Sequence, residues 1–193
     1  MIILALGSNL KSTFGDRIKT IEAAIIFLES YGIKLIKKSS FYETPAYPNK
    51  EDPNFINIVI EVESKLSPED LASILLFIEK KLGRKRAKKN DPRTCDIDII
   101  DFNNKVFDFY YKDLKFIIPH EKAKYRNFVL IPLEEISPNW LHPKSKETIR
   151  SLINKLSSDE RKSILKIKKN WYNLKMLDQK DLIKKVKNYN KFL

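Results

Sequence analysis

The stretch Pro92-Arg93-Thr94-Cys95-Asp96-Ile97-Asp98-Ile99-Ile100 places polar and apolar side chains alternately from Cys95 to Ile99. Such alternation is typical of a β-strand, and it predicts a strand over residues 94–102. Residues two apart on a strand share a face, and each residue advances the chain by about 3.3 Å. Asp96 and Asp98 therefore project together, about 6.6 Å apart along the strand. Cys95, Ile97 and Ile99 face the opposite way.

The segments around this strand complete an α+β pattern. Upstream, Ser67 and Pro68 begin a helix that runs to Leu82 and stops at Gly83, and residues 55–62 form a strand before it. Downstream, Asn103-Asn104 predicts a hairpin turn into a return strand at 106–109, followed by an extended stretch at 113–118. Further strands are predicted at 1–5 and 33–42, a loop at 44–54, and helices at 16–30, 127–135 and 147–156. The order β-α-β-β-α-β predicts a largely antiparallel sheet flanked by helices.

The last part of the chain has a different pattern. Residues 159–170 and 178–189 are predicted to form two short, very basic amphipathic helices. We therefore expect one domain over residues 1–158 and a basic helical C-terminal extension over 159–193. Two interpretations of the extension remain open: solvated helices along the domain edge, which we favour, or a docking segment for an acidic partner.

Composition excludes several classes of protein. The chain has 193 residues, of which 42% are hydrophobic, enough for a core and too many for wholesale disorder. A single cysteine cannot form an intramolecular disulfide, and one cysteine with two histidines offers no zinc motif. No leader-like or membrane-spanning stretch is recognisable. We expect a soluble, cytoplasmic protein with no membrane partner.

The net charge of +12 first suggests nucleic acid, but the excess is local. Residues 84–93 contain six basic residues and one acidic residue, a net charge of +5. Residues 160–193 contain eleven basic and three acidic residues, a net charge of +8. The remainder of the chain is nearly neutral. An RNA-binding α+β module stays an alternative, although the aromatic motif typical of such modules is absent. We expect no nucleic-acid partner.

The paired aspartates suit a divalent cation. Two ionised carboxylates on one strand face repel each other, and Mg²⁺ is commonly held by one or two carboxylates together with substrate phosphates. The alternative is a pair of solvated aspartates on an open face. The adjacent basic segment, residues 84–93, offers guanidinium and ammonium donors to phosphate oxygens, although a solvated charge run is the usual fate of such a segment.

Two further groups of residues have candidate roles. His120, which follows Pro119, and Arg126 could donate to a phosphate or a leaving oxygen. Taken by itself, a lone histidine favours a structural role, and a structural role is also our interpretation of His142. Aromatic and amide residues between 44 and 57 could bind a flat heteroaromatic molecule, because Phe55 and Asn57 share one strand face. From pattern alone, we favour a plain hydrophobic core position for the two phenylalanines, Phe55 and Phe128.

Together these segments resemble the 6-hydroxymethyl-7,8-dihydropterin pyrophosphokinase family of folate biosynthesis. The resemblance lies in residues 4–10 (LALGSNL), 39–45 (SSFYETP), 55–57 (FIN), 79–86 (EKKLGRKR), 92–98 (PRTCDID) and 119–133 (PHEKAKYRNFVLIPL). It implies a ferredoxin-like fold, and transfer of pyrophosphate from ATP to the pterin hydroxymethyl oxygen with release of AMP. Substrates are then the small molecules ATP and the pterin, and we expect a monomer. Another magnesium-dependent nucleotidyl or phosphoryl transferase remains an alternative.

The resemblance also implies residue roles. Two Mg²⁺ ions would be held by Asp96 and Asp98. The implied catalytic residues are Arg84, Arg93, Asp96, Asp98 and His120. The implied ATP-binding residues are Glu79, Arg84, Arg86, Lys89, Arg93, Ile99, Lys115, Ile117, His120 and Arg126. The implied pterin-binding residues are Thr44, Pro45, Tyr47, Phe55, Asn57 and Phe128, with the two phenylalanine rings sandwiching the bicycle.

The sequence departs from the family at three positions. Leu76 stands where a glutamine commonly contacts the nucleotide, Asn90 replaces a frequent tryptophan, and Glu121 follows the histidine where Pro or Tyr is usual. The basic segment also leaves Lys88 and Lys89 as alternatives for the same phosphate contact.

Overall fold

A fully antiparallel sheet lies at the centre of the computed structural model, which describes residues 1–85, 91–168 and 179–190. Its strands are β1 (Ile2–Ser8), β2 (Lys34–Lys38), β3 (Tyr42–Thr44), β4 (Phe55–Glu63), β5 (Asp96–Phe102) and β8 (Leu165–Lys166). They follow the order β5-β1-β4-β3-β8, and β2 also pairs with β4. The α1 and α2 crossovers place β1 between β5 and β4, which is the ferredoxin-like arrangement expected from the sequence.

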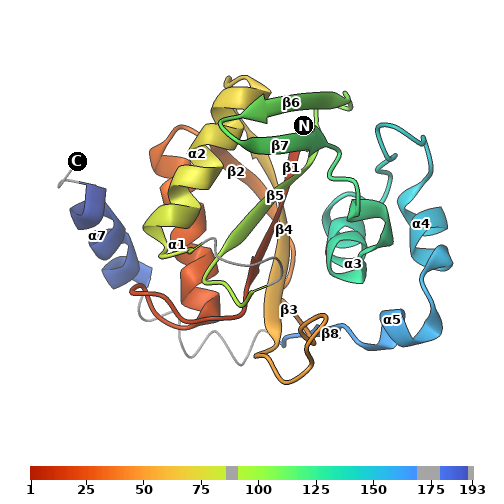
Figure 1. Ribbon diagram of the computed structural model, residues 1–193, viewed down its shortest axis with the longest axis horizontal. Coiled ribbons are helices and arrows are strands. Elements are labelled where there is room, and N and C mark those ends of the chain that lie inside the picture. The colour runs from red at the N-terminus through yellow and green to blue at the C-terminus, as the bar shows by residue number, and fades with distance from the viewer. Residues whose placement is uncertain (86–90, 169–178, 191–193) are drawn as a thin grey trace.

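Strand β1 shows how the sequence builds two layers on the sheet. Ile2, Leu4 and Leu6 belong to a buried cluster with helices α1 (Arg17–Ser30) and α2 (Pro68–Lys81). Ile3 and Ala5 belong to a second cluster with helices α3 (Asn127–Ile136) and α4 (Ile149–Lys155). Figure 1 shows α1 and α2 on one face of the sheet and α3 and α4 on the other. The strand is thus apolar on both faces because both are covered.

The predicted starts of α1 and α2 are confirmed. Asp16 caps α1 by accepting a hydrogen bond from the backbone N–H of Lys19, at 3.0 Å. Ser67 caps α2 in the same way, with Pro68 at the first helical position. A side-chain oxygen at the cap satisfies a backbone donor that has no partner inside the helix. The Ser67 cap fixes where α2 begins and therefore which of the α2 side chains face β5.

Two predicted strands differ in the structure. The strand predicted over 33–42 is interrupted and forms β2 and β3, because Ser39 turns its hydroxyl to the backbone N–H of Val59. The prediction that residues 106–109 return along the preceding strand is wrong. Residues 107–109 belong to β6 (Phe107–Tyr111), which pairs with β7 (Leu114–Ile118) in a separate two-stranded sheet. Asn103 and Asn104 do form the expected turn, both with positive φ.

The C-terminal part also departs from expectation. The helix predicted over 159–170 is wrong, because α5 (Ser158–Lys162) is short and Leu165–Lys166 then pair with β3 as β8. Residues 169 and 170 lie outside the described part. The second predicted helix is confirmed as α7 (Gln179–Asn190), which packs on α1 with Leu182 and Val186 buried (Figure 1).

Candidate active site

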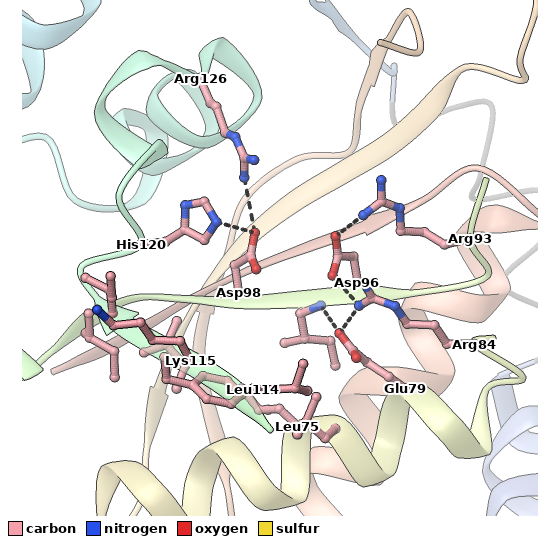
Figure 2. Close-up of a pocket in the computed structure, with 16 residues that line it drawn as sticks. Leu75, Glu79, Arg84, Arg93, Asp96, Asp98, Leu114, Lys115, His120 and Arg126 are labelled. Carbon is pink, nitrogen blue, oxygen red and sulfur yellow. Dashed lines mark hydrogen bonds and ion pairs between the residues drawn. The ribbon is translucent and has the colours of Figure 1, made fainter. Parts of the chain in front are cut away.

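Strand β5 carries the two aspartates to one side of the sheet. Asp96 and Asp98 both rise from the same side of β5 (Figure 2), as the two-residue spacing predicts. The intervening Ile97 is buried in the core, as is Ile99. Opposite Asp98 on the neighbouring strand β1 lies Ala5, which is small and leaves room beside the carboxylate.

Asp96 is held by two arginines. Arg84, which follows α2, contacts Asp96 Oδ1 and also Glu79 Oε1, and Arg93 Nη1 donates to Asp96 Oδ2 at 2.7 Å. Glu79 is itself buried and accepts a hydrogen bond from the backbone N–H of Ile97 at 2.9 Å. Glu79 therefore ties the end of α2 to β5, and it orients Arg84 toward Asp96.

Asp98 has looser partners from the other side of the site. Arg126 Nη1 lies 3.3 Å from Asp98 Oδ2, and His120 Nε2 lies 3.9 Å from the same oxygen. His120 Nδ1 accepts the backbone N–H of Lys122 at 3.2 Å, so the neutral imidazole carries its proton on Nε2, facing Asp98. Arg126 lies at the start of α3 and His120 follows β7, so three elements converge on β5.

The two carboxylates have opposite electrostatic environments. Burial alone would raise the pKa of Asp96, but the guanidinium groups of Arg84 and Arg93 hold this pKa below its usual value. Burial and the negative charge of Asp96 raise the pKa of Asp98, and His120 and Arg126 oppose this only in part. Of the two carboxylates, Asp98 is therefore the one whose negative charge is less well neutralised by neighbouring positive groups.

The donor set fits Mg²⁺ only together with a substrate. Within the described ranges, no group of three or more His, Cys, Asp or Glu side chains forms a metal site. Two carboxylate-bearing residues on one strand face match a cation that takes its remaining oxygens from phosphates and water. The raised pKa of Asp98 shows the same shortage of positive charge. Asp96 and Asp98 are thus suited to hold Mg²⁺ when a polyphosphate is present.

A cavity of about 290 Å³ joins these residues to an apolar region. Every described residue that the resemblance implies for ATP binding lines it: Glu79, Arg84, Arg93, Ile99, Lys115, Ile117, His120 and Arg126, together with Asp96 and Asp98. Arg86, Lys88, Lys89 and Asn90 lie outside the described residues. The Lys115 ammonium group lines the cavity but pairs with Asp108 at 3.1 Å.

Several lining residues were not predicted from the sequence. They are apolar: Leu75, Ile97, Leu114, Phe116 and Ile118, besides the Leu76 already noted. Leu75 lies on α2, whereas Leu114 and Lys115 lie on β7, and all three line the cavity (Figure 2). By sequence pattern, an apolar residue that lines a cavity cannot be distinguished from one that lies in the hydrophobic core. These residues could have been identified only from the knowledge that β6 and β7 form a hairpin that packs on α2. A polar cavity end beside an apolar one suits a nucleotide.

Part of the implied pterin group comes together on β3 and β4. Asn57 Nδ2 donates to Thr44 Oγ1 at 2.9 Å, and both side chains are buried. Gly7 pairs with Asn57 across β1 and β4, and a Cβ on Gly7 would lie 3.1 Å from Asn57 Oδ1. The glycine therefore leaves the space in which the Asn57 amide sits. Pro45 and Tyr47 are exposed, Tyr47 with 84% of its surface accessible.

The two phenylalanines of that group lie under arginines of the cavity. The Arg93 guanidinium lies 5.5 Å from the centre of the Phe55 ring, and that of Arg126 lies 5.4 Å from the centre of the Phe128 ring. Such cation–π contacts order both partners. Arg93 is further fixed by Asn9, whose side chain accepts its backbone N–H at 2.7 Å. Asn9 was not predicted as a site residue, although it belongs to the LALGSNL segment.

The remaining singled-out residues have no access to the cavity. Cys95 is fully buried, and burial raises the pKa of its thiol well above the ordinary value. His142 is also buried, and its Nδ1 accepts the backbone N–H of Ser145 at 3.1 Å. His142 fits the structural role interpreted from the sequence, and Cys95 lies away from the two aspartates, as the alternation along the strand predicts.

Comparisons with known proteins point to one family. A sequence model described as 7,8-dihydro-6-hydroxymethylpterin-pyrophosphokinase (HPPK) matches residues 3–138. The 2-amino-4-hydroxy-6-hydroxymethyldihydropteridine pyrophosphokinase of Synechocystis is 36% identical over 155 residues, covering 80% of this chain and 75% of the relative. The enzyme of the same name from Aquifex aeolicus is 38% identical, covering 74% of this chain and 83% of the relative.

Other matches are to longer proteins. The folic acid synthesis protein fol1 of Pneumocystis carinii is 37% identical over 85% of this chain, which spans 21% of that protein. A solved Plasmodium falciparum HPPK-DHPS structure superposes on 86% of the chain with a TM-score of 0.68 and 16% identity, and the chain spans 46% of it. This likeness supports the fold. In the part of the chain that the structure describes, no helix has the length and apolarity to cross a membrane.

The family model covers well over half of the chain, and the two bacterial pyrophosphokinases are matched over most of their own lengths. Three of the segments that carry the resemblance, residues 79–86, 92–98 and 119–133, contribute side chains to the cavity. The chain therefore belongs to the 7,8-dihydro-6-hydroxymethylpterin-pyrophosphokinase family, which functions in folate biosynthesis.

Proposed function

We propose that this chain itself transfers pyrophosphate from ATP to the hydroxymethyl group of 6-hydroxymethyl-7,8-dihydropterin in a Mg²⁺-dependent reaction. A bond forms between the hydroxymethyl oxygen and the β-phosphorus of ATP. The bond between the β-phosphorus and the oxygen that bridges it to the α-phosphorus breaks. AMP leaves with this oxygen, and the hydroxymethyl proton is released. The observation that carries the proposal is one cavity containing every described residue implied for ATP binding, beside the two aspartates.

The protein's part in this reaction is positioning and charge neutralisation. Phosphoryl-type transfer needs no protein nucleophile, and it gains most from orienting the reactants and balancing phosphate charge. Arg93, Arg126 and His120 are aimed into the cavity beside the carboxylates (Figure 2), where their N–H groups can bind phosphate oxygens. Asp96 and Asp98 would hold Mg²⁺, which when bound supplies further positive charge to the phosphates.

The apolar end of the cavity is assigned to the adenine. Leu75, Leu114 and Phe116 offer it flat contact away from water. The pterin is assigned to the β3–β4 side, where Thr44 and Asn57 provide polar groups and Phe55 and Phe128 provide ring faces. Arg93 and Arg126 contact both those rings and the aspartates, so the two assigned subsites are contiguous.

AMP formation tests the proposal directly. Purified protein is incubated with ATP and Mg²⁺, with and without the hydroxymethyl-dihydropterin, and AMP and pterin diphosphate are quantified by chromatography. We expect AMP and pterin diphosphate in equal amounts, only when both substrates and Mg²⁺ are present. AMP no higher than in the ATP-only control would overturn the proposed function.

The variant Asp98→Asn sharpens this test because it keeps the side-chain shape and removes the charge. We expect turnover to fall by a factor of about 100 or more, as is typical when a group that stabilises transition-state charge is lost. The thermal unfolding midpoint should not fall, since the like-charge repulsion from Asp96 is also removed. Wild-type turnover in this variant would contradict the metal-binding role of Asp98. The expectations of a monomer, a cytoplasmic location and no nucleic-acid partner stay predictions.

A further inference from the structure

The segment that follows the predicted domain boundary contacts two elements, β3 and the start of α3, that carry residues implied for pterin binding. Residues 158–167, called the brace below, comprise α5, the link after it, and β8 with Ile167. One end of the brace contacts the start of α3, which carries Arg126 and Phe128. The other end pairs with β3, which carries Thr44. No segment of the matched family model extends to these residues, because that model ends at residue 138.

The β8 end extends the sheet beside β3. Tyr42 pairs with Lys166 and Glu43 with Leu165, and the backbone N–H of Ile167 donates to Phe41 O at 2.9 Å. Strand β3 is only three residues long and reaches Thr44. Without β8 it would have a single hydrogen-bonded neighbour, β4, over this length. A short strand with partners on both sides is held more firmly than a short edge strand.

Glu135 fastens this pairing to α3. Its carboxylate accepts hydrogen bonds from the Tyr42 hydroxyl at 2.8 Å and from the Ser40 hydroxyl at 2.8 Å. The Lys166 ammonium group of β8 lies 3.2 Å from the same carboxylate. One side chain of α3 therefore bonds to β3 and to the brace together.

The α5 end fastens the start of α3. Asn127 Nδ2 donates to Glu160 O and to Ser163 Oγ, the latter at 3.0 Å. Asn127 lies between Arg126 and Phe128, and its Oδ1 accepts the backbone N–H of Phe128 at 2.7 Å. A change in the position of Asn127 therefore moves the arginine that faces Asp98 and the ring that this arginine covers.

We propose that residues 158–167 act as a brace that positions Thr44 and Phe128 for pterin binding, so that the catalytic unit extends past residue 158. The identity of the ligand rests on the proposed function. The brace residues are positioning residues: they act through β3 and the first turn of α3. The structure thus assigns a role in substrate binding to a segment that the sequence grouped with the basic extension.

Two full-length variants break the brace at opposite ends. Ile167→Pro removes the N–H that bonds to Phe41 O, and Ile167→Val is its matched control because it keeps that N–H and most of the apolar contact. Asn127→Asp keeps the oxygen that caps Phe128 and loses the two donors to the brace. Thr148→Ala removes the N-cap of α4. It serves as a control for a loss of stability that does not involve the brace, β3 or the first turn of α3.

The readouts are the Kd for the pterin by fluorescence titration, the KM values for pterin and ATP from AMP formation, and the urea unfolding midpoint. We expect Ile167→Pro and Asn127→Asp each to raise the pterin Kd and KM at least threefold, and Ile167→Val and Thr148→Ala to change them less than twofold. Partial unfolding lowers kcat with the active fraction but leaves KM unchanged, so a purely structural role predicts a different pattern.

Each outcome is decisive. A pterin Kd equal to that of the wild type in both brace variants, whatever their stability, overturns the brace while wild-type turnover upholds the proposed function. If Ile167→Pro does not fold, Asn127→Asp with Ser163→Ala decides the question, since both act on the α5 end. A wild-type protein that neither binds the pterin nor forms AMP overturns both proposals.

Discussion

At the scale of single residues, Asp96 and Asp98 are chemically identical but differ in their partners. Both oxygens of Asp96 are engaged, by Arg84 and Arg93, whereas Oδ2 of Asp98 has the Arg126 guanidinium at 3.3 Å and the His120 imidazole at 3.9 Å. The alternation in the sequence predicts their shared face, because that depends only on strand geometry. It cannot predict the difference, because Arg84 comes from the end of α2 and Arg126 from the start of α3. Asp98 is consequently the carboxylate whose negative charge the protein itself neutralises less.

Gly7 gives a second residue-scale prediction. An added Cβ would lie 3.1 Å from Asn57 Oδ1 and 3.7 Å from Phe55, so Gly7→Ala must shift the amide that bonds to Thr44. We expect a severalfold higher KM for the pterin, since the polar group moves, and an unchanged KM for ATP, since Gly7 does not line the nucleotide cavity. Steady-state kinetics with each substrate varied in turn measures both. An equal rise in both KM values would contradict the assignment of Asn57 to the pterin side.

At the scale of elements, the helices and strands with clear local signals were predicted, whereas the pairing partners of the short strands β6 and β8 were not. The start of α2 follows from Ser67 and Pro68, and the turn at Asn103-Asn104 follows from residues that adopt positive φ readily. The pairing of β6 with β7, and of β8 with β3, depends on which strand lies nearby in the folded chain. Two residues such as Leu165-Lys166 carry no strand periodicity, so only the open edge of β3 explains β8.

Glu135, which joins α3, β3 and β8, makes stability depend on pH. Burial alone would raise its pKa, but hydrogen bonds from Ser40 and Tyr42 hold it below the ordinary 4.5. A carboxyl with a lowered folded-state pKa stabilises the fold above the unfolded-state value and loses that contribution as pH falls through the folded-state value. We expect Glu135→Gln to lower the free energy of unfolding by about 1–2 kcal/mol at neutral pH.

The difference between wild type and Glu135→Gln should shrink as the pH falls below 4.5, because the wild-type carboxyl then becomes neutral as well. Urea unfolding of both proteins at about pH 7 and about pH 3 measures this difference, and the comparison cancels the effect of other carboxylates. A difference that stays constant over this range would show that the charge on Glu135 contributes nothing.

At the scale of the whole molecule, most of the net charge of +12 lies in residues 84–93 and residues 160–193 of the sequence. Some of the C-terminal lysines have partners within the molecule: Lys166 pairs with Glu135, and Lys185 donates to Thr13 O. The Lys185 ammonium also lies 5.6 Å from the centre of the Phe14 ring. Together with the buried Val186, these contacts hold the described elements β8 and α7 against the rest of the molecule, as expected for the second predicted helix.

Whether α7 belongs to the same folding unit as the sheet is tested at Val186. Its side chain is fully buried in the cluster that also contains Phe14 and Phe27 on the α1 side of the sheet. Val186→Ala removes two buried methyl groups, which should lower the free energy of unfolding by about 2 kcal/mol, cavity included. If unfolding is cooperative, the slowest-exchanging amides of β1 lose the same free energy of protection, because they exchange only when the whole unit opens.

Lys187→Ala is the matched control, since Lys187 is exposed on the same helix and alanine is at least as favourable in a helix. We expect it to leave β1 protection unchanged. Hydrogen exchange followed by NMR, with urea unfolding by circular dichroism, measures both variants. Unchanged protection of β1 in Val186→Ala would mean that α7 opens independently of the sheet. In that case residues 179–190 would form an appendage, and the cooperative unit would end with the strand that pairs with β3.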